Sequence, residues 1–203
     1  MTNILAIAGS PSHPSRTYAI LEHAAKTLAE QGLNLDIISV RDIPAEDLAY
    51  GRYDSPALEK PKALLEKASG VIIATPIYKA AYTGVLKAFL DLLPQKALLG
   101  KVVLPVATGG TIAHLLSVEY ALKPVLSELG ARHILSTVYA VDKQIQIQPN
   151  GSVQLDEEID QRLQDVLKEF AQAVKYSQNA AKEFAHAGLL IRFSVTPFSL
   201  AAG

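Results

Sequence analysis

The chain has 203 residues, 49% of them hydrophobic, which suits one well-buried domain rather than two large ones. Its formal net charge is −1, with acidic and basic residues interspersed, so it lacks the basic surface that nucleic-acid binding requires. It has no cysteine, which excludes disulfides, thiolate catalysis and cysteine-bound metal centres and suits a reducing compartment.

The sequence carries none of the usual signals for a membrane or for export. No apolar run reaches the ~18 residues of a membrane span, and the first residues lack the basic segment and apolar core of a secretory signal. We therefore expect a cytoplasmic protein with no membrane and no nucleic-acid partner.

Short apolar, β-branched runs alternate along the chain with amphipathic stretches of helical length. Strands are predicted near residues 3–8, 34–40, 70–75, 101–107 and 132–140. Helices are predicted near residues 15–31, 56–69, 83–93, 113–129 and 156–175, with Gly32, Gly70, Gly100 and Gly130 at boundaries. This alternation predicts an α/β fold, a flavodoxin-like three-layer sandwich with a five-stranded parallel sheet in the order 2-1-3-4-5.

In such a fold, ligands bind at the carboxyl ends of the strands, where the strand order reverses. The first strand leads into Gly-Ser-Pro-Ser-His-Pro-Ser-Arg-Thr, residues 9–17, which places small residues and hydroxyl groups at the start of a helix. Helix N-termini favour anions, so we predict a phosphate site formed by Ser10, Ser15, Arg16 and Thr17. The alternative is an ordinary turn followed by a helix cap.

The phosphate-loop signatures that the first loop lacks narrow the choice of ligand. It contains neither G-x-x-x-x-G-K-[ST] nor G-x-G-x-x-G, the patterns of nucleoside triphosphate and dinucleotide sites. The remaining donors suit a terminal monophosphate without a metal. Flavin mononucleotide (FMN) is the candidate, because flavodoxin-like folds hold its phosphate at this position.

The second loop, Thr75 to Gly84, contains groups that a flat heteroaromatic ring needs. They come from Pro76, Ile77, Tyr78, Lys79 and Ala80. Backbone amides after Pro76 can donate to the ring, Tyr78 can cover one face, and Lys79 can stabilise negative charge on a reduced flavin. The alternative is a strand end with tyrosines packed beneath a loop.

The third loop has two glycines between hydroxyl residues: Thr108, Gly109, Gly110 and Thr111. Glycines let the backbone approach a ring edge, and either threonine can bond its polar rim. His114 is expected to cap or pack, since hydride transfer to a flavin needs no protein proton donor near the carbon centres. The histidines show no metal-ligand spacing, so no metal is expected.

Seven sequence motifs resemble those of one enzyme family. They are Ala8-Gly-Ser-Pro with Pro-Ser-Arg16, Asp54-Ser-Pro-Ala-Leu58, Ala74-Thr-Pro-Ile-Tyr-Lys-Ala-Ala-Tyr82, Gly84-x-Leu-Lys-x-x-Leu-Asp-Leu-Leu-Pro94, Gly100-Lys-Val-Val-Leu-Pro105, Ala107-Thr-Gly-Gly-Thr111 and Tyr120-Ala-Leu-Lys-Pro-Val-Leu126. Over about residues 3–175 the chain resembles the NADPH-dependent FMN reductases of the flavodoxin-like superfamily. It is most similar to the flavin reductase component of two-component alkanesulfonate monooxygenase systems.

The resemblance implies an activity, partners and an assembly. The protein would transfer hydride from NADPH to N5 of FMN and supply reduced FMN to a monooxygenase that desulfonates alkanesulfonates, a step of sulfur assimilation. Residues 76–80 and 108–111 would hold the isoalloxazine, and Ser10, Ser15, Arg16 and Thr17 the phosphate. Many relatives carry an arginine soon after Gly-Ser-Pro, where this chain has Ser12, and Arg16 is the substitute. A homotetramer is implied, with a dimer as the alternative.

Pro124 lies inside a strongly helical stretch and removes the amide that would bond the carbonyl of Tyr120. A local irregularity is therefore predicted at Tyr120. In the reductases that this chain resembles, a π-helical insertion at the matching tyrosine lies at a tetramer interface and is associated with flavin release. The alternative is a tyrosine that packs over a proline kink.

We divide the chain into a flavodoxin-like reductase domain, residues 1–175, and a C-terminal extension, residues 176–203, which is expected to pack on a neighbouring subunit. The alternatives are that it docks the partner monooxygenase or is an incidental extension. Two other functions stay open. The protein could be a quinone or azo-dye reductase with tightly bound FMN, or a non-enzymatic electron carrier like flavodoxin. Its near-neutral charge argues against the carrier. No basic pair for the 2′-phosphate of NADPH can be picked out, which leaves the choice between NADPH and NADH open.

Overall fold

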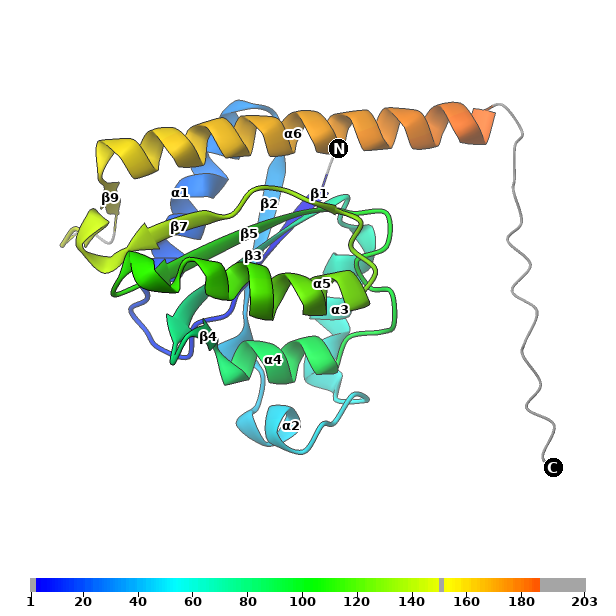
Figure 1. Ribbon diagram of the computed structural model, residues 1–203. Coiled ribbons are helices and arrows are strands. Elements are labelled where there is room, and N and C mark those ends of the chain that lie inside the picture. The colour runs from blue at the N-terminus through cyan, green and yellow to red at the C-terminus, as the bar shows by residue number, and fades with distance from the viewer. Residues whose placement is uncertain (1–2, 150–151, 187–203) are drawn as a thin grey trace.

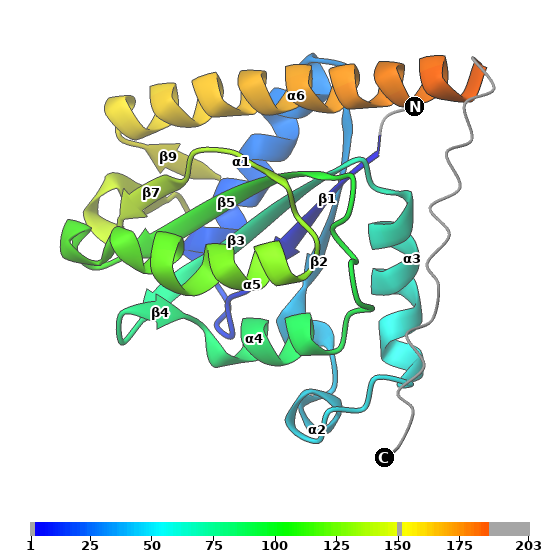
Figure 2. The same cartoon turned by 45° about the vertical axis from the view of Figure 1, so that its right-hand side comes forward.

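The structure is a computed structural model that describes residues 3–149 and 152–186. Of the predicted C-terminal extension, residues 187–203 lie outside the described residues. A mostly parallel sheet forms the middle layer, and helices cover both of its faces (Figures 1 and 2).

Four long or medium parallel strands build the sheet in the order β2-β1-β3-β5. They are β1 (Asn3–Ala8), β2 (Asn34–Ser39), β3 (Gly70–Tyr78) and β5 (Val102–Gly109). The edge position next to β5 is shared by β6 (His133–Ile134) and β7 (Val138–Val141), which both pair with β5 in parallel. The predicted α/β fold and strand order 2-1-3-4-5 are confirmed.

The sheet nevertheless has seven strands rather than five. The predicted strand 132–140 is interrupted at residues 135–137, where the carbonyl of Thr137 accepts a hydrogen bond from the Arg162 side chain. In addition, β4 (Ala81–Tyr82) pairs antiparallel with the end of β3. A separate hairpin, β8 (Ile145–Ile147) with β9 (Val153–Leu155), was not predicted.

The helices separate into two layers. One face of the sheet carries α1 (Arg16–Glu30) and α6 (Glu157–His186), and the other carries α3 (Glu59–Lys67), α4 (Gly84–Asp91) and α5 (Lys123–Glu128). A short helix, α2 (Ala45–Ala49), lies in the irregular segment after β2. Helix α6 runs past the predicted end at residue 175, so the proposed domain boundary falls inside it.

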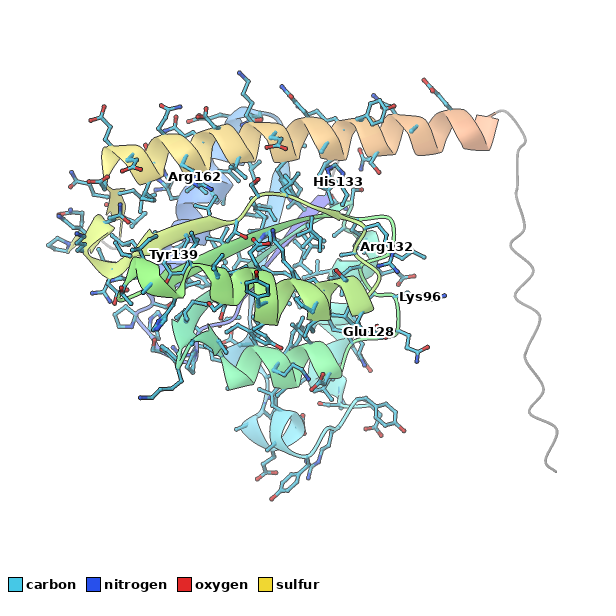
Figure 3. The ribbon with its side chains drawn as sticks, in the orientation of Figure 1. Lys96, Glu128, Arg132, His133, Tyr139 and Arg162 are labelled. Atoms are coloured by element: carbon cyan, nitrogen blue, oxygen red, sulfur yellow. The ribbon has the colours of Figure 1, made fainter. Side chains whose placement is uncertain are left out.

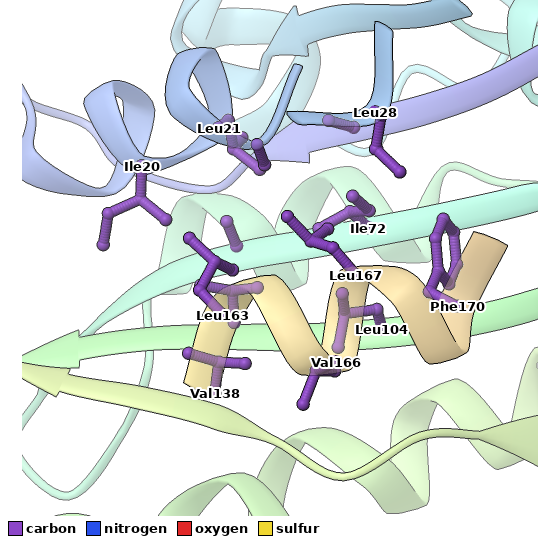
Figure 4. Packing of buried hydrophobic residues seen from close by; sticks show 14 of the residues in the cluster. Ile20, Leu21, Leu28, Ile72, Leu104, Val138, Leu163, Val166, Leu167 and Phe170 are labelled. Carbon is purple, nitrogen blue, oxygen red and sulfur yellow. The ribbon is translucent and has the colours of Figure 1, made fainter. Parts of the chain in front are cut away.

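Alternate residues of the same strand belong to two separate cores. Ile4 and Ala6 belong to the cluster beneath α1 and α6, whereas Leu5 and Ile7 belong to the cluster beneath α3, α4 and α5. Figure 4 shows the first cluster, in which Leu163, Val166, Leu167 and Phe170 of α6 pack against the sheet. Burial on both faces explains why the strand sequences are continuously apolar.

The predicted helix 113–129 is broken into three parts. It begins as a 3₁₀ turn (Ile112–His114), continues as a π-helix (Val118–Leu122) and ends as α5. In the π-helix, the N–H of Lys123 donates to the carbonyl of Val118, five residues earlier. The predicted irregularity at Tyr120 is thereby confirmed, and Pro124 is its cause, since it offers no amide to the i−4 carbonyl.

Within the described part of the chain, no helix combines the length and apolar character needed to cross a membrane.

Candidate functional site

The first loop places hydroxyl groups at the N-terminus of the 15-residue helix α1. Ser15 is the N-cap residue, and its side-chain oxygen accepts from the N–H of Tyr18 at 3.3 Å. The first amides of a helix have no acceptor within the helix, and the first turn of α1 carries no acidic residue. Arg16 lies half-exposed beside these amides, so the loop presents donors and positive charge to an anion.

Hydrogen bonds tie the three predicted loops together. The hydroxyls of Thr17 and Thr108 lie 2.9 Å apart and join the first loop to the third. The N–H of Gly9 donates to the carbonyl of Ala74 at 2.7 Å, and the hydroxyl of Thr83 donates to the carbonyl of Gly9. The second loop is therefore fixed to the first at both its beginning and its end.

A cleft of about 550 Å³ opens between the loops, within the ~300–1,000 Å³ usual for small-ligand sites. Its lining includes seven of the predicted site residues: Ser10, Ser15, Arg16, Thr17, Pro76, Tyr78 and Thr108. A smaller cleft of about 330 Å³ continues along the first loop towards Ser39 and Arg41. The structure thus brings the phosphate loop and the ring loop together at one opening.

The second loop is a hairpin tip. Tyr78 pairs with Ala81, and the two residues between them, Lys79 and Ala80, have φ values of 51° and 62°. Two consecutive positive φ values are typical of a type I′ turn, which usually contains glycine or asparagine. This tip holds Tyr78, which is 49% exposed, against the cleft. Lys79 and Ala80 are exposed outside the cleft lining, whereas Ile77 is buried in the core.

The third loop is held by a buried tyrosine on β7. The hydroxyl of Tyr139 donates to the carbonyl of Thr111 at 2.8 Å, and the residue is only 4% exposed. Gly109 makes this contact possible, because a Cβ there would lie 2.3 Å from the Tyr139 hydroxyl. Burial, and secondarily the charge of Asp142, raises the pKa of Tyr139, so the hydroxyl keeps its proton and acts as a donor.

The end of the third loop lies outside the main cleft. Gly110 and Thr111 line a second cleft of about 530 Å³, on the far side of the segment that follows β7. Tyr120 is 78% exposed on the π-helix and lines none of these three clefts.

Sequence reasoning missed one wall of the main cleft. Asp142, Ile145, Gln146 and Ile147 line it, and a carboxylate oxygen of Asp142 lies 3.9 Å from the Arg16 guanidinium. The signal was present in the sequence. These residues directly follow an apolar strand, so they lie at the same carboxyl edge of the sheet as the three loops.

The donor set of the main cleft fits FMN. Hydroxyls, helix amides and one arginine suit a phosphate monoester, and Pro76, Tyr78 and Thr108 offer flat and polar contacts for a ring. Among the described residues, no group of three or more histidine, aspartate or glutamate side chains is arranged to hold a metal ion. The cleft therefore offers a place for both the phosphate and the ring.

Known proteins support this assignment. The sequence model of the family described as "NADPH-dependent FMN reductase" matches residues 2–146. An Escherichia coli K12 protein named "FMN reductase (NADPH)" is 49% identical over 173 residues, 84% of this chain and 89% of that protein. A Pseudomonas putida protein of the same name is 45% identical and covers 82% of this chain and 85% of its own length.

A solved structure extends the likeness from sequence to fold. It is the apo form of an NADH:FMN oxidoreductase called EMOB, which is 38% identical and superimposes with a TM-score of 0.76. The match covers 85% of this chain and 90% of that one. The chain therefore belongs to the NADPH-dependent FMN reductase family, and it is an oxidoreductase whose ligands are FMN and NADPH.

Proposed function

We propose that this protein reduces FMN with NADPH and releases the reduced FMN to a separate monooxygenase, one that desulfonates alkanesulfonates. The observation that carries the first part is the main cleft, where the α1 N-terminus with Arg16 and the ring-facing residues Tyr78 and Thr108 share one opening. The second part rests on the resemblance of the sequence motifs. Proteins named "NADH-dependent FMN reductase" SfnE and SfnF, 29–37% identical to this chain, supply further relatives.

Each side chain has a role that follows from its position. The hydroxyls of Ser10 and Ser15, the first amides of α1 and the Arg16 guanidinium bind the phosphate. Thr17 acts through its bond to Thr108, which holds the third loop beside the first. Bound FMN supplies the N5 atom that accepts a hydride. Tyr78 limits the access of water to one side of the cleft, and Lys79 at the exposed hairpin tip contributes positive charge.

The protein contributes position rather than proton transfer in this scheme. Ionisable side chains that line the main cleft are Arg16, Tyr78 and Asp142. Arg16 and Asp142 face each other at 3.9 Å, so Asp142 offsets part of the positive charge that Arg16 brings to the phosphate loop. We therefore propose no catalytic acid or base, and the backbone at Pro76, Tyr78 and Thr108, which line the cleft, orients the isoalloxazine.

We also propose that the π-helical segment packs against a second copy of the chain in a homo-oligomer. Leu116 and Tyr120 are 57% and 78% exposed, and neither lines any of the three clefts. Apolar side chains gathered on one segment are typical of an interface. Because this segment continues directly from the third loop, an interface there can influence how long flavin stays in the cleft.

The decisive measurement is steady-state oxidation of NADPH by flavin-stripped protein with free FMN varied under air. We expect the rate to saturate with FMN at concentrations far above that of the enzyme, and alkanesulfonate oxidation only when the partner monooxygenase is added. A rate that levels off at one FMN per subunit and then depends on added quinone or azo dye would contradict flavin release. The quinone and azo-dye reductase would then be the better assignment.

Tyr120→Ala separates the interface from the chemistry. We expect a smaller oligomer by sedimentation and slower turnover of free FMN, while a single reduction of bound FMN is retained. Unchanged sedimentation together with unchanged turnover would remove the role proposed for Tyr120.

Arg16→Gln tests the phosphate site. We expect FMN binding to weaken about tenfold, since a partly exposed charge-assisted contact is lost, while riboflavin binding stays the same. Asp142→Asn should strengthen FMN binding, because it removes the anion that faces Arg16. The matched control is Arg132→Gln, which removes an exposed cation that bonds to the carbonyl of Ser127, outside the cleft. Equal losses for FMN and riboflavin in Arg16→Gln would place the phosphate elsewhere.

A further inference from the structure

The second cleft, beside the third loop, contains two cations that the reaction scheme does not use. Lys143 follows β7, and Arg162 lies on the second turn of α6. Figure 3 shows Arg162 on the sheet side of α6, across from Tyr139 of β7. The cleft measures about 530 Å³, and one acidic residue, Glu158, also lines it. Its ionisable lining is therefore Lys143, Arg162, Glu158 and Tyr139, with an excess of positive charge.

Hydrogen bonds fix the walls of this cleft. An Arg162 amino group donates to the carbonyl of Thr137 at 3.1 Å, and the guanidinium carries further N–H donors that can bond a ligand. Gln144 accepts from the N–H of Val141 at 3.0 Å, and its backbone carbonyl accepts from the N–H of Asp156 at 2.9 Å. On the opposite side, Tyr139 holds Thr111. The two cations thus sit on a rigid frame.

The second cleft adjoins the first. The segment from Val141 to Ile147 separates them, since Asp142, Ile145, Gln146 and Ile147 line the main cleft and Val141, Lys143 and Gln144 line the other. The third loop contributes to both clefts, because Thr108 lines the main cleft and Gly110 and Thr111 line the second. A ligand that occupies the main cleft and extends past the third loop would therefore enter the second cleft.

The other cationic side chains near the main cleft lie away from the second cleft. Arg16 belongs to the phosphate loop and faces Asp142, and Arg41 lines the small cleft that continues from the same loop. Lys79 is exposed at the hairpin tip. A second phosphate group that arrives from the ring side would therefore meet Lys143 and Arg162.

We propose that Lys143 and Arg162 bind the 2′-phosphate of NADPH, so that this second cleft selects NADPH over NADH. The proposal rests on the proposed function, in which NADPH delivers a hydride to the neighbouring cleft. An arginine that bonds a ribose 2′-phosphate is a common solution for NADPH, and a planar guanidinium suits phosphate oxygens. Glu158 opposes the phosphate and limits the affinity that the two cations provide.

The test measures binding of 2′,5′-ADP and 5′-AMP to the FMN-saturated full chain by calorimetry. We expect 2′,5′-ADP to bind about tenfold more tightly than 5′-AMP in the parent protein. Lys143→Gln should reduce that ratio about threefold, and the double variant Lys143→Gln/Arg162→Gln should bring it close to one. Glu158→Gln should raise it. Lys168→Gln, which removes an exposed cation elsewhere on α6, is the matched control and should leave it unchanged.

The outcomes separate this inference from the proposed function. A double variant that keeps the parent ratio, or a parent protein that binds both nucleotides equally, overturns the role of the second cleft. Because Arg162→Gln also removes the bond to Thr137, Lys143→Gln alone decides the matter if the double variant does not fold. If the parent protein neither binds FMN by flavin fluorescence nor oxidises NADPH, the proposed function itself fails.

Discussion

Gly109→Ala is expected to weaken FMN binding by about 10- to 100-fold, because it forces the third loop to move. A Cβ at this position would lie 2.3 Å from the Tyr139 hydroxyl and 3.2 Å from the ring carbon that carries it. Tyr139 is buried, so it cannot swing into solvent. The hydroxyl must leave the carbonyl of Thr111, and the backbone proposed to contact the isoalloxazine loses its support.

Tyr139→Phe provides the matched control, since it removes only the hydroxyl. It should weaken FMN binding about tenfold or less, through loss of one buried hydrogen bond. In the double variant Gly109→Ala/Tyr139→Phe the shortest contact is gone, and the remaining distance of 3.2 Å requires a small shift. We therefore expect the double variant to resemble Tyr139→Phe alone, measured by fluorescence titration with FMN. Strictly additive losses would mean that Gly109 acts independently of Tyr139.

The main elements of the fold could be predicted from the sequence because their signals are local. The strands β1, β3 and β5 are continuous apolar runs, and each ends in a polar or glycine-rich loop at the same edge of the sheet. The proline at position 124 sufficed to predict an irregular helix at Tyr120. Topology then followed from the requirement that parallel strands connect through helices.

Long-range contacts could not be predicted in the same way. The contact between Gly109 and Tyr139 joins residues 30 positions apart, and the pattern of either segment alone does not reveal it. In the interruption between β6 and β7, the carbonyl of Thr137 accepts a hydrogen bond from Arg162 of α6, which lies 25 positions further along the chain. Lys143 and Arg162 likewise meet at one cleft only when α6 packs beside β7. The sequence alone therefore does not reveal this basic pair.

Two local signals were present but were not used. The alternation Ile145-Gln-Ile147 and Val153-Gln-Leu155 is the pattern of a hairpin, and it forms β8 and β9. The helix predicted to end at residue 175 has no stop signal there, since neither proline nor glycine occurs between residue 175 and Gly188. In the structure α6 continues to His186.

Phe170→Ala is expected to lower the free energy of unfolding by about 3–5 kcal/mol, the largest effect on stability that we predict. Phe170 is fully buried where α6 crosses the sheet (Figure 4). Its ring occupies the space that Gly70 leaves at the start of β3, where a Cβ would lie 2.6 Å from Cζ of Phe170 and 2.7 Å from Cγ2 of Val174. Truncation leaves a cavity that helix and strand, fixed by their other contacts, cannot close.

Urea denaturation followed by circular dichroism measures this loss of stability. The control is Tyr176→Ala, because Tyr176 lies on the same helix but is 77% exposed. This substitution should change the free energy of unfolding by about 0.5 kcal/mol or less. Gly70→Ala adds a second test. In the parent protein the new Cβ at position 70 meets the side chains of Phe170 and Val174, whereas in Phe170→Ala only the contact with Val174 remains. Gly70→Ala should therefore lower the free energy of unfolding less in the Phe170→Ala background than in the parent protein. If Phe170→Ala lost no more stability than Tyr176→Ala, α6 would not pack on the sheet as described. The frame that places Arg162 beside Lys143 would then fail with it, because the same helix carries both Phe170 and Arg162.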